Sequence, residues 1–197
     1  MNKVLVLSPH FDDGIVGCGG TISRFLEEGK EIWYVIFAWT DQGTNMSEIE
    51  NSILTLGIPK DHLIILDYPV RRFNEHRQEI LEDLLKFRTE IAPDLVLCHR
   101  SDDNHQDHQI VRSEAFRAFK EHSIWGYELP WNIRNKDKHV SLYKRNVEQK
   151  IKALNCIGSQ RNRRYYDPKR RESHCISRGE EINKDYAEKF EPISDII

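Results

Sequence analysis

Histidines and carboxylates are concentrated in two short segments that lie far apart in the sequence. Residues 9–13 are Pro-His-Phe-Asp-Asp, and residues 102–108 are Asp-Asp-Asn-His-Gln-Asp-His. Each segment follows an apolar run, and polar groups of this kind are costly to bury together unless they bind something. Two imidazoles and one carboxylate form the protein ligand set of an open, catalytic zinc site. The two segments therefore predict a metal-dependent hydrolase.

The candidate side chains would divide into metal ligands and acid–base groups. They are His10, Asp12, Asp13, His105, Asp107 and His108. Zinc lowers the pKa of a bound water from 15.7 to about 7. A carboxylate beside that water can act as general base, and an imidazolium can protonate a leaving amine. The residue types alone also admit Fe²⁺ or another divalent ion in place of Zn²⁺.

The spacing of apolar residues predicts which elements position these groups. We expect strands at 3–7, 31–38, 63–66, 94–98 and 123–127, and helices at 21–28, 46–56, 75–91, 107–120 and 144–157. Such alternation is typical of an α/β fold, here a single Rossmann-like three-layer sandwich with a mostly parallel sheet over residues 1–197. Both polar segments directly follow a strand, so we expect them to meet at the carboxyl edge of the sheet. Apart from the helix at 144–157, the chain beyond residue 131 is expected to be loop-rich.

Composition narrows the class of protein. The chain has 197 residues, 39% hydrophobic and 31% charged, which is typical of a globular protein. No apolar run reaches the roughly 20 residues of a transmembrane helix, and the N-terminus does not resemble a signal peptide. The four cysteines form no Cys-x-x-Cys pair, so we expect reduced thiols in a cytoplasmic protein. The net charge of −3 argues against a nucleic-acid partner.

A basic stretch at 161–178 has two interpretations. It contains Arg164 and Arg178 among seven arginines and lysines, and only two acids. It could be a solvated loop, or it could clamp a phosphate-bearing substrate, because guanidinium forks match phosphate oxygens.

Three glycines near the first polar segment suggest a competing function. Gly17, Gly19 and Gly20 follow a predicted strand, as in a dinucleotide-binding fingerprint. The spacing does not fit, because the sixth position of that pattern is Ile22. We interpret these glycines as a tight turn before the helix and keep a nucleotide-dependent enzyme as a lesser alternative.

The two polar segments resemble the signatures of the LmbE-like, or PIG-L, deacetylases. That family opens with Pro-His-Pro-Asp-Asp-Glu and Gly-Cys-Gly-Gly-Thr, which here are Pro9–Gly14 and Gly17–Thr21. Its distal Asp-x-His-x-Asp-His corresponds to Asp103–His108. The resemblance implies a zinc-dependent enzyme that removes the acetyl group from an N-acetylated sugar.

Carried over residue by residue, the resemblance also implies roles. His10, Asp13 and His108 would bind zinc, and Asp12 would be the general base. His105 would stabilise the oxyanion and donate the proton, paired with Asp107. Two positions of the opening motif depart from the family pattern: Phe11 replaces its proline and Gly14 replaces its glutamate. They put the identity of the substrate in doubt more than the reaction.

Substrate contacts are expected from the segment that follows the predicted strand at 123–127. Trp131 could stack on a sugar face and Asn132 could bind hydroxyls, although core packing of the aromatic residues is an equal alternative. The substrate would be a small N-acetylated sugar, free or linked to a nucleotide, lipid or other phosphate. A catalytically silent sugar- or metal-binding protein is the main alternative, and the oligomeric state, a homo-oligomer included, is left open.

Overall fold

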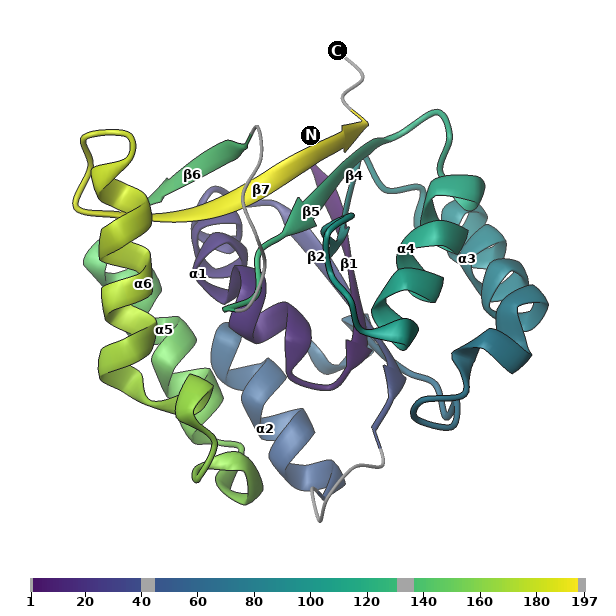
Figure 1. Ribbon diagram of the computed structural model, residues 1–197, viewed down its shortest axis with the longest axis horizontal. Coiled ribbons are helices and arrows are strands. Elements are labelled where there is room, and N and C mark those ends of the chain that lie inside the picture. Colours follow the sequence, from purple (N-terminus) through teal and green to yellow (C-terminus); the bar gives the residue numbers. More distant parts are fainter. Residues whose placement is uncertain (1, 40–44, 131–136, 195–197) are drawn as a thin grey trace.

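The computed structural model describes residues 2–39, 45–130 and 137–194, and these residues build one seven-stranded sheet (Figure 1). The strand order is β3-β2-β1-β4-β5-β7-β6. The strands are β1 (Lys3–His10), β2 (Glu31–Ala38), β3 (Leu63–Ile65), β4 (Leu95–His99), β5 (Ser123–Tyr127), β6 (Lys138–Leu142) and β7 (Tyr186–Ser194). Strands β1 to β5 are parallel, whereas β7 is antiparallel to both β5 and β6. The predicted mostly parallel sheet is confirmed.

Helices cover both faces of the sheet (Figure 1). On one side are α1 (Asp13–Glu27), α2 (Met46–Leu56), α5 (Lys144–Asn155) and α6 (Pro168–Glu180); on the other are α3 (Arg77–Ile91) and α4 (Gln106–Ala118). Two buried apolar clusters fill the two interfaces, one under each helical layer. Short 3₁₀ turns are η1 (Lys60–His62), η2 (Phe73–His76), η3 (Gly158–Gln160) and η4 (Arg164–Tyr166). Within the described ranges, no helix has the length and apolar character needed to cross a bilayer.

The order of the strands creates a switch point between β1 and β4. From β1 the chain runs outward through β2 and β3 on one side, and through β4 and β5 on the other. Crevices at the carboxyl ends of strands on either side of such a point are where open α/β sheets bind ligands. The two polar segments follow β1 and β4, the two strands that flank this point.

The glycine-rich segment is helical, so the prediction of a tight turn there is wrong. Helix α1 already begins at Asp13. A Cβ atom on Gly17 would lie 2.3 Å from Cδ2 of Tyr127, so glycine is needed for α1 to pack this closely against β5. The helix is interrupted at Cys18, whose φ and ψ are −138° and 20°.

The prediction of a loop-rich region beyond residue 131 is also wrong. The chain there forms β6, α6 and β7, and β7 is inserted between β5 and β6. Its strands contain charged residues that are buried in ion pairs. Glu188 of β7, 3% exposed, accepts a 2.7 Å hydrogen bond from the buried Lys150 Nζ. Charges in the interior hide the apolar alternation on which strand prediction depends.

Glu188 also stabilises the interruption in α1. Its two carboxylate oxygens accept hydrogen bonds from the backbone N–H groups of Gly20 (3.0 Å) and Thr21 (2.7 Å). The second half of α1 thereby acquires an N-terminal cap from β7.

Replacement of Glu188 should therefore be strongly destabilising. We expect Glu188→Ala to lower the free energy of unfolding by about 3–5 kcal/mol, because Lys150 is left as an unpaired buried charge. The double variant Lys150→Met/Glu188→Gln should lose less, because it removes both charges. Urea denaturation measures both, with the exposed Glu148→Ala as control. Equal losses in the single and double variants would contradict the ion-pair argument.

Candidate metal centre and catalytic site

The first polar segment is placed by the junction of β1 and α1. His10 is the last residue of β1, and Asp13 is the first of α1, so a single short turn holds both side chains. The backbone N–H of His10 donates to Asp13 Oδ2 at 2.9 Å, which orients that carboxylate toward the strand end.

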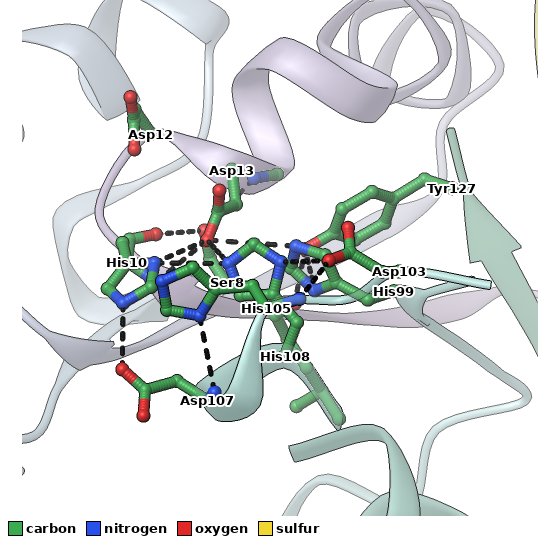
Figure 2. Close-up of polar contacts among 12 residues, drawn as sticks. Ser8, His10, Asp12, Asp13, His99, Asp103, His105, Asp107, His108 and Tyr127 are labelled. Atoms are coloured by element: carbon green, nitrogen blue, oxygen red, sulfur yellow. Dashed lines mark hydrogen bonds and ion pairs between the residues drawn. The ribbon is translucent and has the colours of Figure 1, made fainter. Parts of the chain in front are cut away.

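The second polar segment is placed by the loop between β4 and α4. His99 ends β4, and His105 is the N-cap of α4, where its Nδ1 accepts a hydrogen bond from the backbone N–H of Asp107 at 3.2 Å. His108 follows in the first turn of α4. The expectation that the two segments meet agrees with the structure (Figure 2).

Three side-chain atoms form a nearly equilateral triangle at the centre of the site. His10 Nδ1 lies 3.1 Å from Asp13 Oδ2, His108 Nε2 lies 3.2 Å from Asp13 Oδ2, and the two nitrogens are 3.2 Å apart. Zinc ligands at about 2.0–2.1 Å in tetrahedral geometry are about 3.3–3.4 Å from one another. The triangle therefore has nearly the dimensions of one face of a zinc coordination sphere.

The charges of the site also fit a divalent cation. Burial alone would lower the pKa of His10, but hydrogen bonds to Asp107 and Asp13 raise it to about 10. For His108, the charge of Asp13 and the contact with Asp103 likewise outweigh burial and raise the pKa to about 9. The surrounding carboxylates thus favour two positive charges at this point, which a divalent metal ion would supply instead of protons.

Two carboxylates contact the two imidazoles at the ring nitrogens that lie outside the triangle. Asp107 Oδ2 lies 3.1 Å from His10 Nε2, and Asp103 Oδ1 lies 3.1 Å from His108 Nδ1. Both contacts leave the opposite ring nitrogen directed at the triangle. Carboxylate–histidine pairs of this kind orient metal ligands and raise their basicity.

The position of Asp107 corrects one sequence-based expectation. Its side chain was expected to pair with His105, but it contacts His10 and accepts from the backbone N–H of Arg71 at 2.6 Å. The reason is local: Asp107 lies in the first turn of α4, and its carboxylate points toward the loop before η2. Arg71 there has a positive φ of 67°, a conformation that non-glycine residues rarely adopt.

His99 is a buried imidazole that the sequence analysis did not single out. Tyr127 donates its hydroxyl proton to the carbonyl of Leu7 at 2.8 Å, so its oxygen can accept from His99 Nδ1 at 3.0 Å. The proton of a neutral His99 then lies on Nδ1, and Nε2 keeps its lone pair. Nε2 lies 3.7 Å from Asp13 Oδ2 and has no hydrogen-bond donor among the described residues. An unshared, buried lone pair beside the triangle is a further sign that a cation fits here.

Asp12 stands apart from the cluster around Asp13 (Figure 2). It is 8% exposed, and its Oδ2 accepts a hydrogen bond from the hydroxyl of Tyr166 at 2.9 Å. Burial and the charge of Asp13 raise the pKa of Asp12 to about 6. A carboxyl group with a pKa near neutrality is suited to exchange protons in catalysis.

The site opens into a cavity of about 350 Å³. Besides the two polar segments, the cavity is lined by Val70, Arg71, Gln160, Arg163 and Tyr165. These residues come from two segments outside the polar motifs, at 70–71 and 160–165, and Tyr166 directly follows the second. The sequence signal for the second segment was the basic stretch at 161–178, which contains Arg163.

The expected substrate contacts are placed differently. Arg178 is 8% exposed, and its Nε and Nη2 donate to the two oxygens of Glu128 at 2.7 Å each, so it is part of a buried ion pair rather than a clamp for substrate. Arg164 is exposed on η4 and does not line the cavity. Trp131 and Asn132 lie outside the described residues.

The structure explains why glycine stands at position 14. A Cβ atom there would lie 2.5 Å from the hydroxyl oxygen of the buried Tyr34. The Tyr34 hydroxyl donates to Ser8 Oγ at 3.1 Å. Ser8 Oγ also accepts a hydrogen bond from the backbone N–H of Gly14 at 3.0 Å. Tyr34 thus occupies the space into which a glutamate at this position would extend.

Comparison with known proteins agrees with this geometry. The family model described as "PIG-L: GlcNAc-PI de-N-acetylase" matches residues 5–119. The chain belongs to the PIG-L family. The matched segment of this PIG-L protein runs from β1 to the end of α4, so it contains both polar segments but not Tyr166.

Relatives and solved structures of similar fold are known. The diacetylchitobiose deacetylase of Thermococcus kodakarensis is 29% identical over 58% of this chain and 49% of its own length, so the PIG-L protein spans about half of that relative. The structure of the conserved protein TT1542 from Thermus thermophilus superposes with a TM-score of 0.81 at 23% identity, covering 100% of this chain and 97% of the other. The 4-carboxy-2-hydroxymuconate hydratase GalB of Pseudomonas putida has the same fold, with a TM-score of 0.79, 17% identity and coverage of 100% and 98%. The reaction must therefore be argued from the site, because this fold occurs with more than one chemistry.

The contact between Asp107 and His10 leads to a testable expectation. Asp107→Asn should lower the affinity for zinc by about 10- to 100-fold, because a carboxylate behind a metal-ligating histidine raises its basicity. Competition with a fluorescent chelator measures this affinity, with the exposed Asp61→Asn as control. If Asp107→Asn kept full zinc affinity but lost turnover, Asp107 would instead act through His105.

Proposed function

We propose that this PIG-L protein is a zinc-dependent amide hydrolase that removes the acetyl group from an N-acetylated sugar. The observation on which the proposal rests is the triangle of His10 Nδ1, Asp13 Oδ2 and His108 Nε2 at the floor of a cavity that Asp12 also lines. The family description and the deacetylase from Thermococcus support the reaction and the class of substrate. That residues 1–197 act as a single cytoplasmic domain stays a prediction.

The residues of the site would have separate roles in hydrolysis. When bound by His10, Asp13 and His108, zinc supplies a Lewis acid that polarises a carbonyl group and lowers the pKa of water to about 7. Asp12 takes a proton from the attacking water as its oxygen bonds to the acetyl carbon. The carbon–nitrogen bond then breaks, and a proton from His105 goes to the leaving nitrogen. Acetate and an amino sugar result.

The environment of His105 suits it to the role of proton donor. It lines the cavity beside the triangle, and its ring packs edge-on against His10 with centroids 4.8 Å apart. Burial and the positive charges of His108 and His10 lower the pKa of His105. Once protonated, it is therefore a stronger acid than a histidine in water.

The polar lining of the cavity fits a hydroxylated substrate. Arg71, Gln160 and Arg163 offer hydrogen-bond donors, and Tyr165 offers an aromatic surface. These groups surround the triangle on the open side, where the rest of a sugar would lie if its acetamido group faced Asp12.

Two substitutions should separate metal binding from chemistry. We expect His108→Ala to lose bound zinc and all acetate release, because one ligand of three is removed. Asp12→Asn should keep zinc but lose about 10²–10⁴-fold in kcat, the usual contribution of a general base. Metal content by atomic emission and acetate release from a panel of N-acetyl sugars measure the two effects.

The same panel tests the alternatives. The exposed Glu90→Gln on α3 serves as control, and a chelator should abolish acetate release until zinc is restored. A protein that bound zinc but released no acetate from any sugar would be a silent binding protein, and the proposed function would be wrong. Higher activity with Fe²⁺ than with Zn²⁺ would correct the metal alone.

Tyr166 should affect catalysis without affecting metal binding. Tyr166→Phe removes the hydrogen bond to Asp12 Oδ2, and we expect kcat to fall about 10-fold or more, in the range seen for outer-shell partners. Zinc content should not change, because the hydroxyl of Tyr166 bonds to Asp12, which is not one of the three proposed ligands. The matched control is Tyr143→Phe, whose ring is exposed. Equal kcat in Tyr166→Phe and the wild type would remove Tyr166 from the mechanism.

A further inference from the structure

A second cavity, of about 630 Å³, lies at the start of α6 and shares no lining residue with the metal site. We propose that it binds a phosphate group. Its lining is basic: Lys169, Arg170 and Arg171 contribute, with Asp167 as the only acid.

Arg171 is the residue in this cavity that most favours a bound anion. It is 5% exposed, and its Nε and Nη1 have no hydrogen-bond partner within the part of the chain that the structure describes. Burial lowers the pKa of Arg171, as expected for a guanidinium withdrawn from water. Two buried N–H groups of a guanidinium without acceptors are expensive, and the planar fork of arginine matches the oxygens of a phosphate.

The neighbouring carboxylates are already engaged. Asp167 accepts from the backbone N–H of Arg170 at 3.1 Å, which caps α6. Both oxygens of Glu128 accept from Arg178, and Glu188 accepts from Lys150. Glu128 and Glu188 thus neutralise Arg178 and Lys150, and Asp167 is the one carboxylate among these three whose charge acts on Arg171. One carboxylate against Lys169, Arg170 and Arg171 leaves an excess of positive charge beside the cavity.

One further feature favours an anion in this cavity. The N-terminal end of α6, a helix of 13 residues, adds the positive end of its dipole. His174 is held neutral, because burial and the charges of Lys150 and Arg178 lower its pKa to about 3. Its Nε2 lies 3.4 Å from Glu128 Oε2, so His174 shapes the cavity without adding charge to it.

The two cavities are connected by one segment of the chain. Arg163 and Tyr165 line the metal site, Tyr166 bonds to Asp12, and Asp167 and Arg171 line the second cavity. The phosphate could therefore belong to the N-acetylated substrate, a point that rests on the proposed function. It could equally be a free phosphate, which the second experiment below distinguishes.

Binding of inorganic phosphate is the primary test. Isothermal titration of the purified protein with phosphate should show binding, and Arg171→Met should weaken it by about 10- to 100-fold, because charge-assisted hydrogen bonds are lost. Arg171→Met should melt at the same or a higher temperature, because it removes an uncompensated buried charge. Arg171→Lys should bind with intermediate affinity, and Arg145→Gln, at an exposed ion pair on α5, should bind like the wild type.

Two results of the titration would contradict phosphate binding at Arg171. No measurable phosphate binding by the wild type, or equal binding by Arg171→Met and the wild type, would overturn the proposal. This readout does not depend on turnover, so it stands even if the protein released acetate from no sugar.

Kinetic measurements with a phosphorylated and an uncharged sugar then identify the source of the phosphate. If it belongs to the substrate, KM should be lower for N-acetylglucosamine 1-phosphate than for N-acetylglucosamine. Arg171→Met should remove this difference, whereas Arg145→Gln should keep it. If phosphate binding depends on Arg171 but KM does not, the site binds a free phosphate and is separate from substrate recognition.

Discussion

The structure of the site depends on one carboxylate oxygen, Oδ2 of Asp13. It accepts from the backbone N–H of His10 and lies 3.1 Å from the His10 ring and 3.2 Å from the His108 ring. These contacts join the end of β1, the start of α1 and the first turn of α4. Despite its burial, this carboxyl keeps a pKa well below the usual range, because His108 and His10 stabilise its charge. Asp13 and His108 are 95 positions apart in the sequence. They can meet because β1 and β4 are neighbours in the sheet.

The sequence alone predicted the parts of the fold that depend on continuous apolar runs. Strands β1 to β5 and helices α2, α3 and α4 were expected near their observed positions, because their apolar residues recur with the period of a strand or a helix. Helix α1 was expected only from residue 21, although it begins at Asp13. Strand β7 was missed because Glu188 and Lys189 are buried as ion pairs, which only the folded chain can match with partners. Strand β6 was missed with it, because its one neighbour in the sheet is β7. The glycines of α1 were misinterpreted for a related reason: what requires Gly17 is the ring of Tyr127, which is distant in sequence.

The motif residues of the site could be predicted from the sequence, but their contacts with one another could not. The motif residues were found because histidines and acids at strand ends are chemically unusual, but their mutual contacts were not determined by spacing. Asp107 lies between His105 and His108 in sequence, yet its carboxylate contacts His10, since a first-turn side chain of α4 points toward the loop before η2. The contact between Tyr166 and Asp12 joins residues 154 positions apart and left no local signal.

The division between the matched family segment and the rest of the chain suggests how a single fold could serve different substrates. Residues 5–119 supply the proposed metal ligands and the base, whereas Gln160, Arg163, Tyr165 and Tyr166 come from beyond that segment and close over the same cavity. The loss of a glutamate at Gly14 is compensated locally by Tyr34, which fills the space and bonds to Ser8 without touching the triangle. Changes on both sides of the site can thus alter what enters it while the geometry around Asp13 stays the same, because that geometry is fixed by two strand ends and two helix starts rather than by the loops that surround the substrate.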